Sequence, residues 1–450
     1  MWPAVRRRSP PAQVTNRSSM YFLDKSGGGE AGMLGVLSAD DPRYVMTGFH
    51  TALPCVVAFT TTVQFFSLLC WVEGQRVSSV CMSDHVKLFI PGPVEVRREI
   101  LEAQAQWMIG HRGKAAEALF ARIQTKLRQV FFTRSRVYLS TSSGTGLWEA
   151  AARNCVSDDS EGGVLATVCG AFSERWAEVF ERNGKATTWL RVAEGEPITP
   201  ELVRDALLAR HNAPGRKPFE AIAIVHNETS CGLTNPLAEI VAVVRELSPD
   251  TLILVDAVSS LGGIKVDFDG LGLDVLLTSS QKCLGLPPGL SFAAVSDRAL
   301  EKARHVRNRG YYFDFVELEK FLLKNHTPAT PAISLMFALD KQLDDILTEG
   351  LEARFARHRR MAEITRAWAR RQFDLFPRAG YESDTVTCVK NTRNIDVGAL
   401  NRFLENRGMH ISDGYGSLKG RTFRIAHMAD MTEHDITALL GAIDEFLAEA

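Results

Sequence analysis

The stretch Thr251-Leu-Ile-Leu-Val-Asp256 decides the fold class of this 450-residue chain. Its unbroken apolar run predicts a strand buried on both faces, as in a parallel sheet covered by helices. Asp256 would end that strand, where open α/β sheets bind their ligands. An aspartate in such a place is more often a turn residue or a helix N-cap, so its role depends on what else the chain brings there.

Further buried-strand candidates alternate with helical stretches on both sides of this strand. Such alternation predicts an α/β fold with a mainly parallel sheet and helices on both faces. From about Leu351 the pattern changes to long charged helices, which predicts a smaller C-terminal α/β domain. Strands are predicted near 136–140, 164–168, 221–226, 251–255, 274–278 and 290–295, and helices near 114–130, 173–183, 200–210, 236–247, 332–349, 352–372 and 433–449.

A single lysine, Lys282, follows the next predicted strand, 282 − 256 = 26 residues after Asp256. It lies between a small-polar turn and the stiff segment Pro287-Pro-Gly289. A lysine in a loop is usually solvated, but burial at the end of a strand would disfavour its ammonium form and lower its pKa. A neutral amine attacks an aldehyde. Pyridoxal phosphate needs such a lysine, together with a carboxylate that keeps its ring nitrogen protonated.

The turn Ser142-Ser-Gly-Thr-Gly146 follows a short predicted strand and opens the helical stretch Leu147–Arg153. Backbone N–H groups and the positive helix end make such a turn an anion cradle. The hydroxyls of Ser143 and Thr145 would add hydrogen bonds to a phosphate. Taken alone, a Ser/Gly turn is usually only a helix cap. It has neither the P-loop Gly-Lys-Ser/Thr nor the dinucleotide-binding Gly spacing.

Together these motifs resemble the class V pyridoxal-phosphate aminotransferases of the alanine–glyoxylate and serine–pyruvate group. The resemblance runs from about Met82 to the C-terminus and implies a fold-type I transferase with pyridoxal 5′-phosphate as its cofactor. It also implies a homodimer whose active site is shared across the interface. The motifs that carry it, in family order, are Pro91-Gly-Pro93, Ser143-Gly-Thr-Gly146, His226-Asn-Glu-Thr-Ser-Cys-Gly232, Val255-Asp-Ala-Val-Ser-Ser-Leu-Gly-Gly263, Ser280-Gln-Lys282 and Arg424 within Arg421-Thr-Phe-Arg-Ile-Ala-His427.

The resemblance assigns roles to single residues. Lys282 would hold the cofactor and move protons, Asp256 would face the ring nitrogen, and Phe172 would stack on the ring, where relatives often carry tryptophan. Arg424 would pair with the substrate α-carboxylate, a task that suits a planar guanidinium. The other implied cofactor contacts are Ser143, Gly144, Thr145, Thr229, Val258, Gln281 and Thr330.

Two further segments have roles implied only by the resemblance. Thr330 corresponds to a residue that reaches the phosphate of the neighbouring subunit, with Thr327 and His326 as competitors for that role. A Pro-rich loop without a site role is the alternative. His111 and Arg112 correspond to a segment near the substrate, with a solvated turn as the alternative.

The implied reaction moves an amino group from alanine or serine to glyoxylate or pyruvate, with Lys282 as the base that takes the Cα proton. Cysteine desulfurases usually carry histidines in place of Gln281 and Phe172. Phosphoserine aminotransferases share the glutamine but need extra cationic residues. A catalytically idle cofactor-binding subunit is another alternative, and Arg424 argues against it because only turnover requires that arginine.

The composition of the chain bears on its partners, metal content and compartment. A formal net charge of −1 gives no electrostatic footprint for nucleic acid. The 8 cysteines are scattered without metal-ligand spacing, so we expect free thiols, no metal site and a reducing, cytoplasmic compartment. Cys283, beside the lysine, is expected to be a packing residue.

Residues 1–81 differ from the rest of the chain. They begin with a basic segment and include an uncharged run, 51–72, that is long enough to span a bilayer but is diluted by polar residues. The run is too far from the start for an ordinary signal peptide. We expect 1–81 to be a non-core or misassigned extension, with a membrane anchor or targeting segment as the less favoured alternative. The predicted large domain is then 82–350, with its N-terminal arm, and the small domain 351–450.

Overall fold

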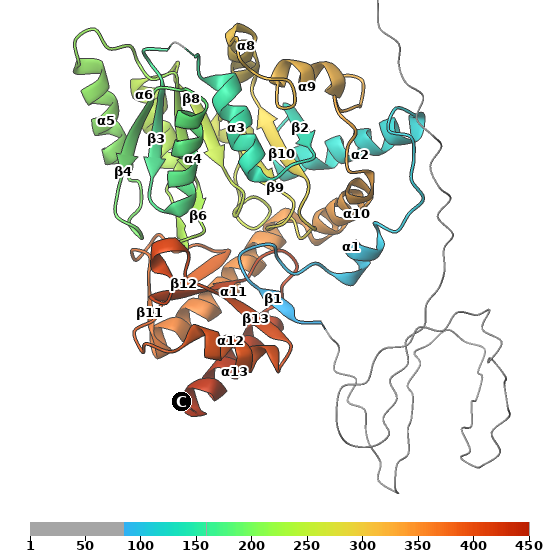
Figure 1. Ribbon diagram of the computed structural model, residues 1–450, viewed down its shortest axis with the longest axis vertical. Helices are drawn as coiled ribbons and strands as arrows, with labels where there is room; N and C mark the ends of the chain where they lie inside the picture. Colours follow the sequence, from blue (N-terminus) through green and yellow to red (C-terminus); the bar gives the residue numbers. More distant parts are fainter. Residues whose placement is uncertain (1–84, 159, 450) are drawn as a thin grey trace, which may run out of the picture. The chain divides into compact units, whose positions relative to one another are not determined.

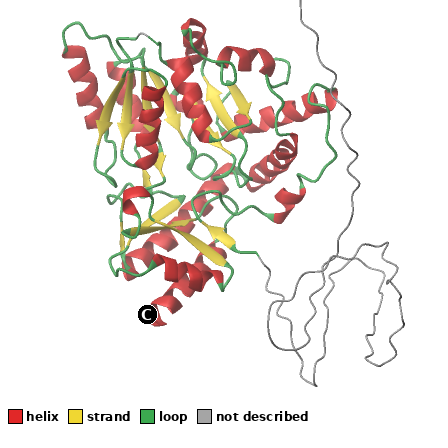
Figure 2. Cartoon of the chain, viewed as in Figure 1, coloured by secondary structure: helices red, strands yellow, loops and turns green. Residues whose placement is uncertain are grey.

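The computed structural model describes residues 85–158 and 160–449. The expectation for residues 1–81 therefore lies outside the described residues. Two sheets, each with its own apolar core and flanking helices, make up the described chain (Figures 1 and 2). This is the α/β architecture that the alternation of strands and helices predicts.

The larger sheet runs in the order β2-β10-β9-β8-β5-β3-β4. Its middle strands, β8, β5 and β9, are wholly buried and mostly aliphatic, because both of their faces are covered. Neighbours from β4 to β9 are parallel, and β10 is antiparallel to both β9 and β2. The strands are β2 (Arg136–Ser140), β3 (Val164–Val168), β4 (Thr187–Arg191), β5 (Ala221–Val225), β8 (Leu252–Asp256), β9 (Val275–Ser279) and β10 (Ser291–Val295).

Helices cover this sheet, and α3 and α4 begin shortly after the carboxyl ends of β2 and β3. Helix α3 packs on β8, β9 and β10, while α4 packs on β3, β4 and β5. Helices α2 and α10 pack against each other, as do α5 and α6. The bounds are α1 (Arg98–Glu102), α2 (Lys114–Val130), α3 (Gly144–Cys155), α4 (Ala171–Arg182), α5 (Pro200–Asn212), α6 (Leu237–Leu247), α7 (Phe268–Leu271), α8 (Asp297–His305), α9 (Phe315–Leu322) and α10 (Ile333–Glu349).

The second sheet has the order β1-β13-β14-β12-β11. Strand β1 pairs parallel to β13, and the other neighbours are antiparallel. Strand β1 therefore joins the C-terminal strands before the chain enters the larger sheet. The elements are β1 (Lys87–Phe89), α11 (Leu351–Gln372), β11 (Asp374–Leu375), β12 (Val386–Lys390), α12 (Val397–Glu405), β13 (Met409–Asp413), the 3-10 turn η1 (Gly416–Leu418), β14 (Thr422–Ala426) and α13 (Glu433–Glu449).

A short hairpin, β6 (Asn227–Glu228) with β7 (Leu233–Thr234), follows β5. Among the described residues, no helix combines the length and apolarity needed to cross a bilayer.

Candidate active site

Lys282 lies in the loop that joins β9 to β10. Ser280 shapes this loop, since its hydroxyl donates to the carbonyl of Pro287 at 2.7 Å and accepts from the Leu290 N–H at 3.2 Å. The Lys282 amine donates a hydrogen bond to the carbonyl of Pro91. A Cβ on Gly92 would lie 2.6 Å from the amine, so only glycine lets that backbone approach it.

The environment of Lys282 has the electrostatic effect that the sequence predicts. Burial, reinforced by the positive charge of Arg424, lowers the pKa of Lys282 to about 8. Roughly a tenth of the amine is then neutral at pH 7, far more than at the ordinary lysine pKa. The side chain can therefore act as a nucleophile and as a base near neutral pH.

Asp256 is the last residue of β8 and is 4% exposed. Its carboxylate accepts hydrogen bonds from the Trp148 indole N–H at 2.7 Å and from the Val258 backbone N–H at 2.6 Å. Burial nevertheless raises the pKa of Asp256 to about 6. This carboxylate lacks a directly bonded cation among the described residues, and a cationic ring N–H beside it would favour its ionised form.

Trp148 was not among the predicted site residues. It lies one turn into α3, directly after the Ser/Gly turn. A buried tryptophan usually needs a hydrogen-bond acceptor for its N–H, and this rule could have indicated from the sequence that Trp148 bonds a buried polar group.

Phe172 lies at the N-terminal end of α4. The Lys282 amine is 6.0 Å from the centroid of its ring, and the centroid of the Tyr415 ring is 5.0 Å from that centroid. The Arg175 guanidinium donates to the Tyr415 hydroxyl at 2.7 Å. Tyr415 belongs to the loop between β13 and β14, so this contact joins the two sheets of the fold; sequence reasoning did not assign it.

Glu228 fixes the start of α4 and thereby the position of Phe172. Its fully buried carboxylate accepts from the backbone N–H groups of Phe172 at 3.3 Å and Ser173 at 2.9 Å. It also accepts from the hydroxyls of Ser173 at 2.9 Å and Ser230 at 2.6 Å. A carboxylate is stabilised by the free N–H groups and positive end of a helix.

Arg424 is buried in the middle of β14. Its guanidinium donates to the carbonyl of Asp413 at 3.2 Å from two nitrogens and to the carbonyl of Thr229 at 3.4 Å. It lies 5.4 Å from the centroid of the Tyr415 ring. Within residues 85–158 and 160–449, no carboxylate forms a salt bridge with Arg424. A buried guanidinium that meets only carbonyls is prepared for an anionic ligand.

The Ser/Gly turn meets the Asp256 segment closely. A Cβ on Gly144 would lie 2.5 Å from a methyl carbon of Val258, so only glycine fits between them. The side chains of Ser143 and Thr145 are exposed, and the Ser143 hydroxyl does not cap α3. Both hydroxyls are thus available at the helix N-terminus.

Two buried polar atoms beside Lys282 have no hydrogen-bond partner among the described residues, namely the Ser279 hydroxyl and the Gln281 side-chain carbonyl. Buried polar atoms are rarely left without partners, so these two indicate that a ligand or water binds here. Thr229 completes the region, since its hydroxyl donates to the Ser259 hydroxyl at 2.8 Å.

Among the described residues, no hydrogen bond joins the segment 326–330 to these site residues. Thr330 is exposed. Arg112 holds the segment through the carbonyls of Thr327 at 2.7 Å and Pro328 at 3.1 Å, and His326 lies 3.4 Å from Glu117. The role of Thr330 across a subunit interface stays a prediction, as does the role of His111.

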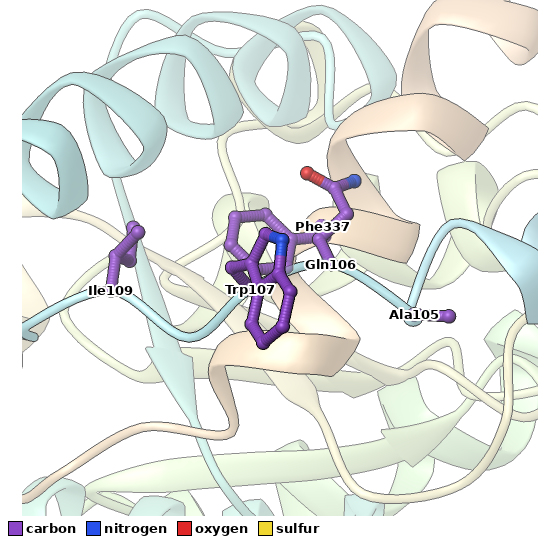
Figure 3. A pocket seen from close by; sticks show the side chains of 5 residues that line it. All are labelled: Ala105, Gln106, Trp107, Ile109 and Phe337. Atoms are coloured by element: carbon purple, nitrogen blue, oxygen red, sulfur yellow. The ribbon is translucent and has the colours of Figure 1, made fainter.

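An open hollow of about 730 Å³ lies outside this set of residues (Figure 3). Trp107, whose side chain is 95% exposed, stands over it. None of the predicted site residues lines the hollow, so we do not assign the reaction to it despite its size. Its lining residues are Ala105, Gln106, Trp107, Ile109 and Phe337.

The chain is similar to proteins of a known family. A family model described as aminotransferase class-V matches residues 97–439. The protein described as an uncharacterized aminotransferase of Methanocaldococcus jannaschii is 36% identical over 366 residues, which cover 80% of this chain and 92% of that protein.

Two more similarities bear on function. The protein described as the soluble hydrogenase 42 kDa subunit of Anabaena cylindrica is 34% identical over 370 residues, covering 82% of this chain and 94% of its own. The crystal structure of an alanine–glyoxylate aminotransferase from Nostoc sp. matches with a TM-score of 0.73 at 30% identity, covering 84% of this chain and 98% of that one.

Proposed function

This chain belongs to the class-V aminotransferase family, and from that premise we propose that it uses pyridoxal 5′-phosphate to move an amino group from alanine or serine to glyoxylate or pyruvate. Arg424 carries the proposal. Its buried guanidinium has no acidic partner among the described residues, and it lies beside the aromatic pair Tyr415 and Phe172 that leads to the Lys282 amine. A cation in this position suits the α-carboxylate of an amino acid.

The residues present fit the cofactor. Lys282 would hold it covalently, Asp256 would face its ring nitrogen, and Phe172 would lie on its ring. The unpaired hydroxyl of Ser279 and carbonyl of Gln281 support a bound polar group at this place. Thr229 and Val258, which contact the Asp256 segment, would complete the lining.

The phosphate would lie at the N-terminus of α3, where the helix end and backbone N–H groups attract an anion. Ser143, Gly144, Thr145 and Gln281 would contact it. In this proposal the close fit of Gly144 against Val258 places the turn beside the carboxylate segment.

Each residue then has a definite task. When bound, pyridoxal phosphate supplies an aldehyde carbon for the lysine amine and a ring that accepts the electrons of the broken Cα–H bond. Arg424 fixes the substrate through its α-carboxylate and aligns the Cα–H with Lys282. Displaced from the cofactor by the amino donor, Lys282 would be a free amine, and its lowered pKa would let it take that proton and return it at the former aldehyde carbon of the cofactor. Asp256, when ionised, keeps a proton on the ring nitrogen.

We propose that a second copy of the chain completes the site, with Thr330 reaching the partner's phosphate. Thr330 is exposed and therefore available for such a contact. Large apolar side chains are also exposed, including Trp107 at 95% and Tyr311 at 64%, which is typical of surfaces that another chain covers.

Alanine as the donor and glyoxylate as the acceptor agree with the name of the Nostoc neighbour, an alanine–glyoxylate aminotransferase. A reducing, cytoplasmic compartment remains part of the proposal, supported by the free thiols of Cys155, Cys169, Cys231, Cys283 and Cys388.

The test is a single-turnover assay with the purified, cofactor-loaded protein. L-alanine or L-serine should convert the bound cofactor to pyridoxamine phosphate, and glyoxylate should restore it. Absence of any half-reaction would overturn the proposal in favour of an idle subunit, a reading that the name of the Anabaena relative makes worth testing. Sulfide release from L-cysteine would instead indicate a desulfurase.

A further inference from the structure

Arg354, on α11, is a fully buried arginine that none of the proposed catalytic steps uses. Its Nη2 donates to the carbonyl of Cys283 at 2.9 Å, and its Nε donates to the carbonyl of Gly262 at 3.0 Å. Cys283 directly follows Lys282, and Gly262 ends the turn that follows Asp256. One guanidinium therefore bonds both the loop that carries the lysine and the turn that follows the carboxylate.

The third nitrogen of Arg354 reaches the segment that follows Arg424. Nη1 donates to Asp430 at 2.9 Å and to Glu349 at 2.7 Å. Although burial opposes ionisation, the charge of Arg354 helps to lower the pKa of Asp430 to about 2, so this pair stays charged across the working pH range. Arg354 thus links the loops of the larger sheet to the segment that follows β14.

Glycines let these segments approach each other. A Cβ on Gly285, which has a φ of +65°, would lie 2.8 Å from the Gln342 amide and 3.3 Å from Asp430. A Cβ on Gly263 would lie 3.0 Å from the Cys283 sulfur. The loop after Lys282 is therefore packed against the same polar cluster that Arg354 organises, and it has little room to shift.

From these contacts we propose that Arg354 is a positioning residue for Lys282: it fixes the 282–286 loop to the Asp256 turn and to Asp430, so that the amine stays aligned with the reacting carbon. The inference rests on the proposed function, because it assigns Lys282 the proton transfer. Alignment matters here because a misplacement of about 1 Å can cost on the order of 100-fold in rate.

Helix α11 supplies a matched control in Arg357. It also bonds Glu349, at 2.7 and 3.0 Å, but its other hydrogen bonds go to the carbonyls of Ala429 and Met431. It makes no hydrogen bond to the 282–286 loop in the described part of the chain. R357M removes a charge from the same helix and network, and R357K keeps that charge, and neither variant releases that loop.

The experiment compares R354K and R354M with R357K and R357M, all loaded with pyridoxal phosphate. A lysine keeps the charge of Arg354 but cannot reproduce its planar fork, which reaches acceptors in several directions. In both Arg354 variants we expect faster hydrogen–deuterium exchange in 282–286 and an L-alanine half-reaction slower by roughly 10- to 100-fold. In both Arg354 variants, the pH midpoint of the lysine-bound cofactor's absorbance should also shift. Both Arg357 variants should keep the wild-type exchange rate, half-reaction rate and pH midpoint.

Exchange in 282–286 at the wild-type rate in R354K, or a half-reaction as fast as in the wild type, would overturn the inference. Equal effects in the Arg357 variants would overturn it too, because they would indicate general loosening. If R354M does not fold, the exchange rate and half-reaction rate of R354K alone test the inference. A wild-type protein that reacts with no amino donor would instead refute the proposed function.

Discussion

At the residue scale, burial shifts the pKa of one acidic and one basic group of the site. Burial raises the pKa of Asp256 to about 6 and lowers that of Lys282 to about 8. Each shift favours the neutral form, so both groups are partly neutral near pH 7 in the protein alone. A cofactor with a cationic ring and an aldehyde would give each of them a partner.

The raised pKa of Asp256 has a consequence for stability. Because the folded-state pKa lies above the unfolded value of 3.8, folding favours the protonated carboxyl, and this contribution is lost as pH rises from about 4 to about 6. The loss amounts to roughly 3 kcal/mol in the cofactor-free protein. Asp256→Asn should remove that part of the pH dependence, as urea denaturation between pH 4 and 7 would measure. Asp250→Asn, at an exposed position, should retain it.

Substrate binding depends on Arg424 in this account. Arg424→Ala should raise the KM for L-alanine by about 10- to 150-fold, since a charge-assisted hydrogen bond contributes about 1.5–3 kcal/mol. The fold should persist, because among the described residues the guanidinium forms hydrogen bonds with carbonyls and no salt bridge. Steady-state kinetics would measure this, with the exposed Arg421→Ala as control. An unchanged KM in Arg424→Ala would assign the carboxylate to another cation.

At the element scale, sequence patterns located every strand of the larger sheet except β4 to within a few residues, but they gave no strand of the second sheet. The central strands were predictable because their aliphatic runs are buried on both faces. Strand β4 was missed because Thr187–Arg191 is half-exposed and mixes polar with apolar residues. Pattern alone also could not show that β2 and β10 run antiparallel to their neighbours.

The turn before α3 gives a prediction at this scale. Gly144→Ala should destabilise the protein by about 1–3 kcal/mol, because the new methyl group would overlap the Val258 side chain. Gly441→Ala in α13 is the matched control, since nothing lies within 4 Å of its Cβ position, and it should be neutral or stabilising by up to about 1 kcal/mol. Urea denaturation of both variants would measure the difference. Equal stabilities would contradict the proposed contact between the turn and the Asp256 segment.

At the scale of the whole molecule, the family and the α/β fold followed from motifs in the order of the chain, and the comparisons confirm both. Single residues such as Trp148, Glu228 and Tyr415 could not be assigned in this way. Their roles depend on contacts between segments far apart in sequence, such as α3 with β8 and the β13–β14 loop with α4. The boundaries at 81 and 350 remain predictions.

The most direct measurement is to reduce the cofactor-loaded protein with borohydride and locate the phosphopyridoxyl group by peptide mass spectrometry. Reduction makes the bond between a lysine and the cofactor permanent. The account predicts one labelled residue, Lys282, and neither label nor turnover in Lys282→Ala. A label on any other lysine, or turnover at the wild-type rate in Lys282→Ala, would contradict it.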